Sequence, residues 1–121
     1  MFRVIIAGGR DFTDEQMLFD KMDYYLQNVN DDVAIVCGMA KGADMLGFKY
    51  ATQRGYEIHK YPADWDNDGK SAGYKRNCRM AENADALVAF WDGYSKGTQH
   101  MIEYATRHGL KVRVVRYVQK S

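Results

Sequence analysis

Short apolar runs alternate along the chain with longer stretches in which apolar residues recur every three or four positions. The runs predict five strands, at Met1–Ala7, Val33–Cys37, Tyr56–Tyr61, Ala86–Trp91 and Lys111–Val118. Most of them lack a strict alternation of apolar and polar residues, which is typical of strands buried on both faces. The pattern therefore favours a sheet that is covered on both sides.

The stretches between the predicted strands are amphipathic. They predict four helices, at Thr13–Asn28, Gly42–Arg54, Ser71–Asn83 and Thr98–His108. Thr13 and Gln16 have the spacing of a capping box, and Gly55 fits a helix C-terminal stop. The polar segment Ala63–Gly69 is expected to be a loop.

Alternation of strands with helices of this length predicts an α/β fold with a parallel sheet and helices on both faces. Right-handed crossovers would place every strand-to-helix loop at one edge of that sheet. Ligands of open α/β sheets bind at this edge. The residues of the four loops are therefore the candidates for function.

Length and composition suit one domain over residues 1–121, with 46% hydrophobic residues. No apolar run approaches the ~20 residues that a membrane-spanning helix needs. No basic segment followed by a long apolar stretch indicates a secretion signal, so we expect a cytoplasmic protein without a membrane partner. Cys37 and Cys78 lack the spacing of a metal site. We expect reduced thiols, no metal and no cofactor.

The formal net charge is +1. A domain that holds nucleic acid mainly through its electric field is usually far more basic. We therefore expect nucleic acid to be an unlikely partner. A single phosphorylated small molecule needs only a local cluster of cations, and the net charge leaves that possibility open.

The first loop contains Gly8, Gly9, Arg10 and Asp11. Glycines let backbone N–H groups approach an anion closely, and the following helix N-terminus favours negative charge. Arg10 would offer a forked donor to a phosphate or carboxylate. A plain tight turn with a surface Arg–Asp pair is an equal alternative.

The second loop contains Gly38, Lys41, Gly42 and Asp44. Lys41 is a candidate phosphate contact. Asp44, on the first helical turn, would accept hydrogen bonds from ribose hydroxyls or simply complement the helix dipole. The sequence favours neither role of Asp44 over the other.

The third loop leads into a helix that carries Arg76 and Asn77 beside two lysines. These residues would clamp a phosphate, or they would form a solvated basic face. Trp65 would stack on a base or pack in the core, and we expect packing.

The fourth loop contains Ser95, Gly97 and Thr98, which offer hydroxyls and bare amides at a helix N-terminus. The alternative role of Thr98 is the N-cap of that helix, and a capping hydroxyl can also face a ligand. Four glycine-containing loops at one sheet edge, with Lys or Arg among their residues, form a joint signal that suits a phosphate-bearing ligand such as a nucleotide.

The motifs "GGRDF", "CGMAKGAD", "PADW…GKSAGYKRNCRM" and "AFWDGYSKGTQHMI" occur in this order. From Gly8 to Val115 the chain resembles the SLOG superfamily, named after the Smf/DprA and LOG proteins, and most of all its YspA/YpsA-related branch. The resemblance implies a Rossmann-like three-layer sandwich that binds nucleotides or nucleotide-derived ligands as a sensor or processor in bacterial or phage biology. It also implies a homo-oligomer.

LOG enzymes of this superfamily remove the base from nucleoside 5′-monophosphates. Their motifs are matched here by Arg76, Gly97 and Thr98, but Met101 stands where those enzymes carry a catalytic Glu. Glu103 lies two residues further on, a rotation of about 200° on a helix, so we expect it to face elsewhere. Catalytic residues therefore stay unassigned.

Three hypotheses include a ligand, and a fourth, an interaction protein without a ligand, would leave the four polar glycine loops unexplained. The favoured one is a module that senses, carries or sequesters a nucleotide-like phosphorylated molecule. The second is a LOG-like phosphoribohydrolase or related nucleotide-processing enzyme, in which Arg76 orients the phosphate and Asp44 or Asp11 acts as acid or base. The third is a DprA-like binder of single-stranded DNA, against which the near-neutral charge argues.

Overall fold

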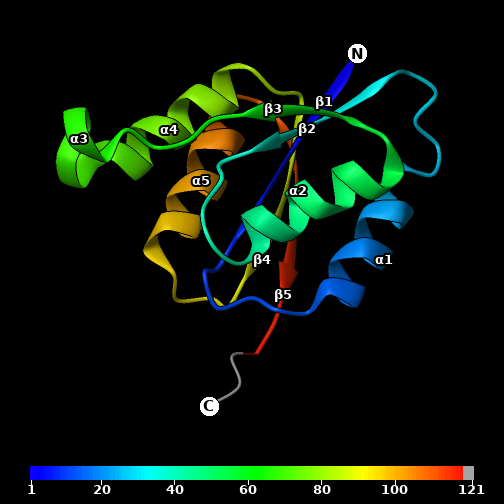
Figure 1. The fold of residues 1–121 in the computed structure, drawn as a ribbon, viewed down its shortest axis with the longest axis horizontal. Helices are drawn as coiled ribbons and strands as arrows, with labels where there is room; N and C mark the ends of the chain where they lie inside the picture. The colour runs from blue at the N-terminus through cyan, green and yellow to red at the C-terminus, as the bar shows by residue number, and fades with distance from the viewer. Residues whose placement is uncertain (119–121) are drawn as a thin grey trace.

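The computed structural model describes residues 1–118 of the chain. One sheet of five parallel strands runs through the molecule in the order β3-β2-β1-β4-β5 (Figure 1). The strands are β1 (Phe2–Gly8), β2 (Val33–Cys37), β3 (Glu57–Lys60), β4 (Ala86–Trp91) and β5 (Lys111–Arg116). The helices are α1 (Glu15–Leu26), α2 (Ala43–Arg54), α3 (Trp65–Asp68), α4 (Ala72–Glu82) and α5 (Lys96–Arg107), with a 3₁₀ turn, η1 (Gly69–Ser71), before α4.

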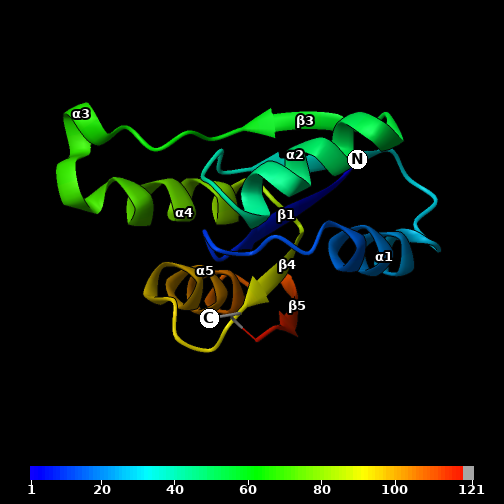
Figure 2. The same ribbon diagram turned by 60° about the horizontal axis from the view of Figure 1, so that its bottom comes forward.

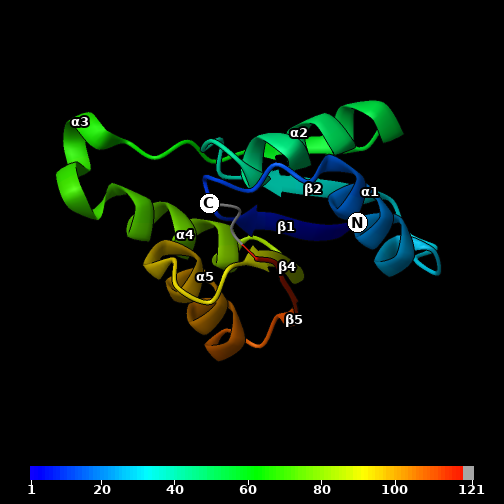
Figure 3. The ribbon, with the colours of Figure 1, turned by 90° about the horizontal axis from the view of Figure 1, so that it is seen from below.

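Helices cover both faces of the sheet. In Figure 3, α1 and α2 lie on one side of β1, and α4 and α5 lie on the other. Strand β1 shows why: Val4 and Ile6 join the apolar cluster under α1 and α2, whereas Ile5 and Ala7 join the cluster under α4 and α5. Side chains alternate between the faces of a strand, so an uninterrupted apolar run supplies both cores. The expected Rossmann-like three-layer sandwich is confirmed.

Several predicted boundaries are corrected by side-chain capping. Helix α1 begins after Asp14, whose carboxylate accepts a hydrogen bond from the Met17 amide at 3.0 Å, and not with a capping box at Thr13. The predicted loop Ala63–Gly69 contains α3, because Asp64 caps it by accepting from the Asn67 amide. This short helix projects beyond the sheet, as Figure 2 shows.

The order in which strands are added to the sheet reverses between β1 and β4, which is the topological switch point. Strand β1 pairs with β2 on one side and with β4 on the other, where Gly8 lies opposite Phe90. The connection through α3 and α4 carries the chain across the sheet. The loops after β1 and β4 therefore diverge toward opposite faces, which opens a crevice at the carboxyl edge. Among the helices of residues 1–118, none is long and apolar enough to cross a membrane.

Candidate ligand-binding site

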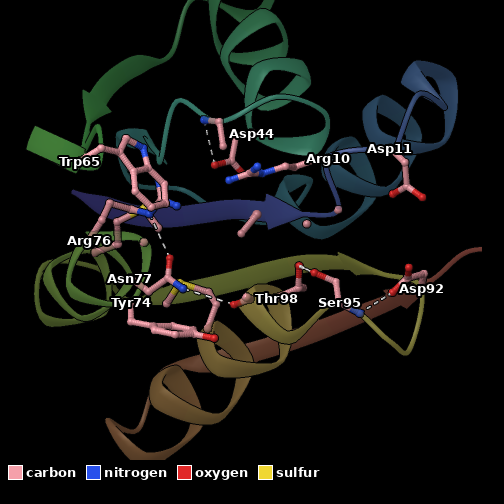
Figure 4. A pocket seen from close by; sticks show the side chains of 18 of the residues that line it. Arg10, Asp11, Asp44, Trp65, Tyr74, Arg76, Asn77, Asp92, Ser95 and Thr98 are labelled. Atoms are coloured by element: carbon pink, nitrogen blue, oxygen red, sulfur yellow. Dashed lines mark hydrogen bonds between the residues drawn. The ribbon is translucent and has the colours of Figure 1, made fainter. Parts of the chain in front are cut away.

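A cavity of about 500 Å³ lies in this crevice, at the carboxyl ends of β1 and β4. Figure 4 shows Arg10 and Asp44 on one side of it and Asn77, Thr98 and Ser95 on the other. Ten of the predicted site residues line it: Gly8, Gly9, Arg10, Asp11, Asp44, Arg76, Asn77, Ser95, Gly97 and Thr98.

The remaining predicted residues lie elsewhere. Gly38 and Lys41 line an adjoining hollow of about 320 Å³. Gly42 lines neither space, and its role is in the backbone: its φ is +81°, and a Cβ there would lie 2.2 Å from the Gly9 carbonyl oxygen. Gly42 thus lets the loops after β1 and β2 approach each other.

The N-terminus of α5 opens into the cavity. Asp92 accepts hydrogen bonds from the amides of Tyr94 and Ser95 at 2.8 and 2.9 Å, which shapes the turn before the helix and lowers the pKa of Asp92. The Ser95 side chain makes no capping bond to the helix. It instead lies 3.2 Å, oxygen to oxygen, from the hydroxyl of Thr98.

Thr98 is therefore the third residue of α5 and not its N-cap. The first amides of a helix have no partner within the helix, and no side chain among residues 1–118 takes that place at α5. Gly97 leaves them uncovered, because a Cβ at this residue would meet nothing within 4 Å. This helix end has the features of an anion site.

The N-terminus of α2 is different, because its first amide already has a hydrogen-bond partner in the protein. The Ala43 amide donates to the Gly9 carbonyl at 3.2 Å, and the Asp44 carboxylate accepts from the Ala40 amide at 3.3 Å. Asp44 is 5% exposed, and its burial raises the pKa of this carboxyl to about 6 against the opposing effect of Arg76. A carboxylate in this position suits hydroxyl donors better than a phosphate.

Arg76 connects the two halves of the site. Its Nη1 donates to the carbonyl oxygen of Gly38, and its Nε donates to Asn77 Oδ1 at 3.0 Å. Asn77, nearly buried, donates in turn to the Gly97 carbonyl at 3.3 Å. Burial lowers the pKa of Arg76, and Asp44 partly offsets this. Arg76 is thus held in place beneath the cavity and is not part of a solvated basic face.

The expectation that Trp65 packs in the core is wrong. Its side chain is 52% exposed and lines the cavity, because α3 holds it away from the sheet. Lys70, one of the two lysines of the third loop, also lines the cavity, as does Tyr74, which was not predicted. The Tyr74 ring lies 4.6 Å from that of His100. The sequence feature that could have revealed the position of Trp65 is Asp64, the N-cap that sets the start of α3.

The acids near the cavity have partners in the protein. Asp11 accepts a hydrogen bond from the Tyr117 hydroxyl at 2.6 Å, and Asp92 holds the turn before α5. Met101 is buried and lines the cavity, whereas Glu103 is exposed and accepts from Gln99 at 3.1 Å, outside it. Within residues 1–118, no group of three or more His, Cys, Asp or Glu side chains is placed to hold a metal ion.

The doubly covered parallel sheet and the cavity at its switch point define an α/β protein of Rossmann-like architecture. The model of the YspA, cpYpsA-related SLOG family matches residues 2–67, and the chain belongs to this family. It is also 35% identical to the Gene 61 protein of Mycobacterium phage D29, over 93% of this chain and 94% of the phage protein. The family resemblance seen in the four motifs is confirmed.

Two solved structures share the fold. DNA processing protein A from Streptococcus pneumoniae is 17% identical with a TM-score of 0.72. The same protein from Helicobacter pylori, whose single-stranded DNA binding mode is described, is 19% identical with a TM-score of 0.68. Each match covers 93% of this chain, which spans 49% of the first protein and 64% of the second.

The prediction that nucleic acid is an unlikely partner is wrong. The same fold occurs in DNA processing protein A from Helicobacter pylori, whose single-stranded DNA binding mode is described, and this conflicts with the prediction. A net charge near zero averages over the whole surface, whereas a binding site depends on where its cations lie. Arg10, Lys70 and Arg76 gather at one cavity in spite of the low net charge.

Proposed function

We propose that this protein binds a phosphorylated small molecule derived from a nucleotide in the cavity at the carboxyl edge of its sheet. One observation carries the proposal: the uncapped N-terminus of α5 opens into the same cavity as Arg10, Arg76 and the exposed Trp65. A phosphate, a sugar and a base each have a matching surface there.

The phosphate would bind the first amides of α5 and the Thr98 hydroxyl, with Arg10 and Arg76 supplying positive charge. Ribose hydroxyls would donate to the Asp44 carboxylate. The base would stack on Trp65, since stacking on an aromatic ring accepts any base. Family membership and the shared fold support a nucleotide-related binding function, in which the protein would sense, carry or sequester its ligand.

The test is a thermal-shift and calorimetric screen of nucleoside monophosphates, dinucleotides, ADP-ribose and a short single-stranded oligonucleotide. A ligand that binds only the native state raises its melting temperature. Trp65→Ala should weaken binding, and Tyr24→Ala, which removes an aromatic that is 65% exposed on α1, should not. Equal effects of the two variants, or no binding of any small molecule, would contradict the proposal.

A second candidate function is hydrolysis of the N-glycosidic bond. The observation that favours it is Asp44, a cavity carboxyl whose pKa is raised to about 6 by burial, close to the range of a general acid or base. The same incubations, analysed for free base and ribose phosphate, test this function. Product that forms with the unmodified protein and disappears with Asp44→Asn would support an enzyme. Binding without product would support the binding function and contradict the enzymatic one.

The predicted homo-oligomer and the cytoplasmic location stay predictions. Light scattering of the purified protein, with and without the ligand found in the screen, measures the number of subunits. A change in that number on ligand binding would favour a sensor over a carrier.

A further inference from the structure

The hollow of about 320 Å³ beside the main cavity has a different chemical character. It lies between the loop after β2 and the segment before α3. Its lining consists of Arg10, Gly38, Met39, Ala40, Lys41, Pro62, Ala63, Trp65 and Arg76. Three of these residues are cations, and none is an acid.

The main cavity, by comparison, is electrostatically mixed. Its lining combines Arg10, Lys70 and Arg76 with the carboxylates Asp11, Asp44 and Asp92. A space lined by cations alone attracts an anion more strongly than one in which acids offset them. The smaller hollow is therefore the better place for a group with a full negative charge.

The two spaces adjoin and share part of their lining. Arg10, Ala40, Trp65 and Arg76 border both. The Nη1 and Nε atoms of Arg76 already donate to Gly38 and Asn77, and this fixes the plane of the guanidinium at the boundary. One molecule that lies across this boundary would contact both spaces.

Lys41 belongs to the smaller hollow alone. Its side chain is exposed, and no ion pair involves it within the described part of the chain. Met39, beside it, has a φ of +64°, which no other non-glycine residue of positions 1–118 adopts in the positive range. An L residue seldom takes this conformation, and here it bends the loop that forms the wall of the hollow.

We propose that the hollow beside Lys41 binds a second phosphoryl group of the same ligand. The ligand class is then a nucleotide with two phosphoryl groups on separate atoms, one at the N-terminus of α5 and one between Lys41, Arg10 and Arg76. This inference rests on the proposed function, because it assigns the second half of the same site.

The experiment compares adenosine 5′-monophosphate with two probes that differ in the spacing of their phosphates. Adenosine 3′,5′-bisphosphate carries both phosphates on one ribose, and a dinucleotide carries its phosphates on two riboses. Calorimetry measures their affinities for the unmodified protein and for Lys41→Ala. Lys21→Ala, an exposed lysine on α1, is the control for loss of one positive charge.

We expect at least one doubly phosphorylated probe to bind about tenfold more tightly than the monophosphate. Lys41→Ala should remove that advantage and leave the monophosphate affinity within about twofold, and Lys21→Ala should change neither. The probe that shows the advantage identifies the source of the second group.

Other outcomes separate the two proposals. Monophosphate binding with no Lys41-dependent advantage for either probe would overturn this inference and leave the proposed function standing. Equal weakening of all three probes in Lys41→Ala would also overturn it, because Lys41 would then act on a single phosphate. Failure of every probe to bind the unmodified protein would overturn both.

Discussion

The Asp44 carboxylate and the Arg76 guanidinium both lie beside Gly38. A Cβ built on Gly38 would lie 2.7 Å from Asp44 Oδ2 and 2.7 Å from Arg76 Nη1. Because Gly38 has no side chain, Asp44 of α2 and Arg76 of α4 both fit against the loop after β2. Gly38 thus lies between side chains from elements that are far apart in sequence.

Gly38→Ala should displace these two side chains while the backbone stays intact. The atoms in the way are the ends of side chains, so we expect a loss of about 1–2 kcal/mol in the free energy of unfolding. We expect nucleotide affinity to fall by about tenfold or more, because Arg76 loses its position. Urea denaturation and calorimetry measure the two quantities. Unchanged affinity would show that the position of Arg76 does not matter for binding.

Gly42→Ala should damage the fold itself. Its φ of +81° and ψ of −128° are essentially restricted to glycine, and the new Cβ would collide with the Gly9 carbonyl. We expect a loss of about 3 kcal/mol or more in the free energy of unfolding. Gly55→Ala is the matched control, with a φ of +71° but open space around it, and should cost about 1–2 kcal/mol. Equal losses in urea denaturation would show that the collision with Gly9 is relieved at no cost.

Gly97→Ala should separate stability from binding. A Cβ at Gly97 has no neighbour within 4 Å among residues 1–118, and alanine favours a helix over glycine, so the free energy of unfolding should rise by about 0.5–1 kcal/mol. The same methyl group would stand beside the amides that we assign to the phosphate, and nucleotide affinity should fall. A variant that is more stable and binds equally well would place the phosphate elsewhere.

Asp44→Asn should stabilise the protein in a pH-dependent way. The folded-state pKa of about 6 lies above the ordinary carboxyl pKa of 3.8, so the folded state binds more protons between these values. The free energy of unfolding therefore falls as pH rises from about 4 to about 6.

At pH 7.5 the Asn variant should be more stable than the unmodified protein by up to about 3 kcal/mol, and this gain should largely vanish at pH 4. Denaturation at the two pH values measures it, with the exposed Asp66→Asn as control. A variant that loses stability at pH 7.5 would show that the Asp44 charge is needed to balance Arg76.

Sequence reasoning about the site succeeded where the signal was local. Gly8, Gly97 and Thr98 follow directly from the alternation of strand, glycine loop and helix. Trp65 was placed in the core because its helix is only four residues long and is set by the Asp64 cap, which gives no apolar periodicity to recognise. Gly38 and Lys41 were grouped with the main cavity because chain order does not show that Arg10, Trp65 and Arg76 divide the edge into two spaces.

The spacing of apolar residues was sufficient by itself for the class of fold, because side-chain periodicity follows from the local geometry of strands and helices. The glycine loops likewise indicated the sheet edge at which the cavity lies. Only the tertiary structure decided that β1 lies beside β4, that Asp44 is buried, and that the N-terminus of α5 is open while that of α2 is occupied. These features depend on contacts between residues far apart along the chain, and local pattern carries no information about which distant groups will meet.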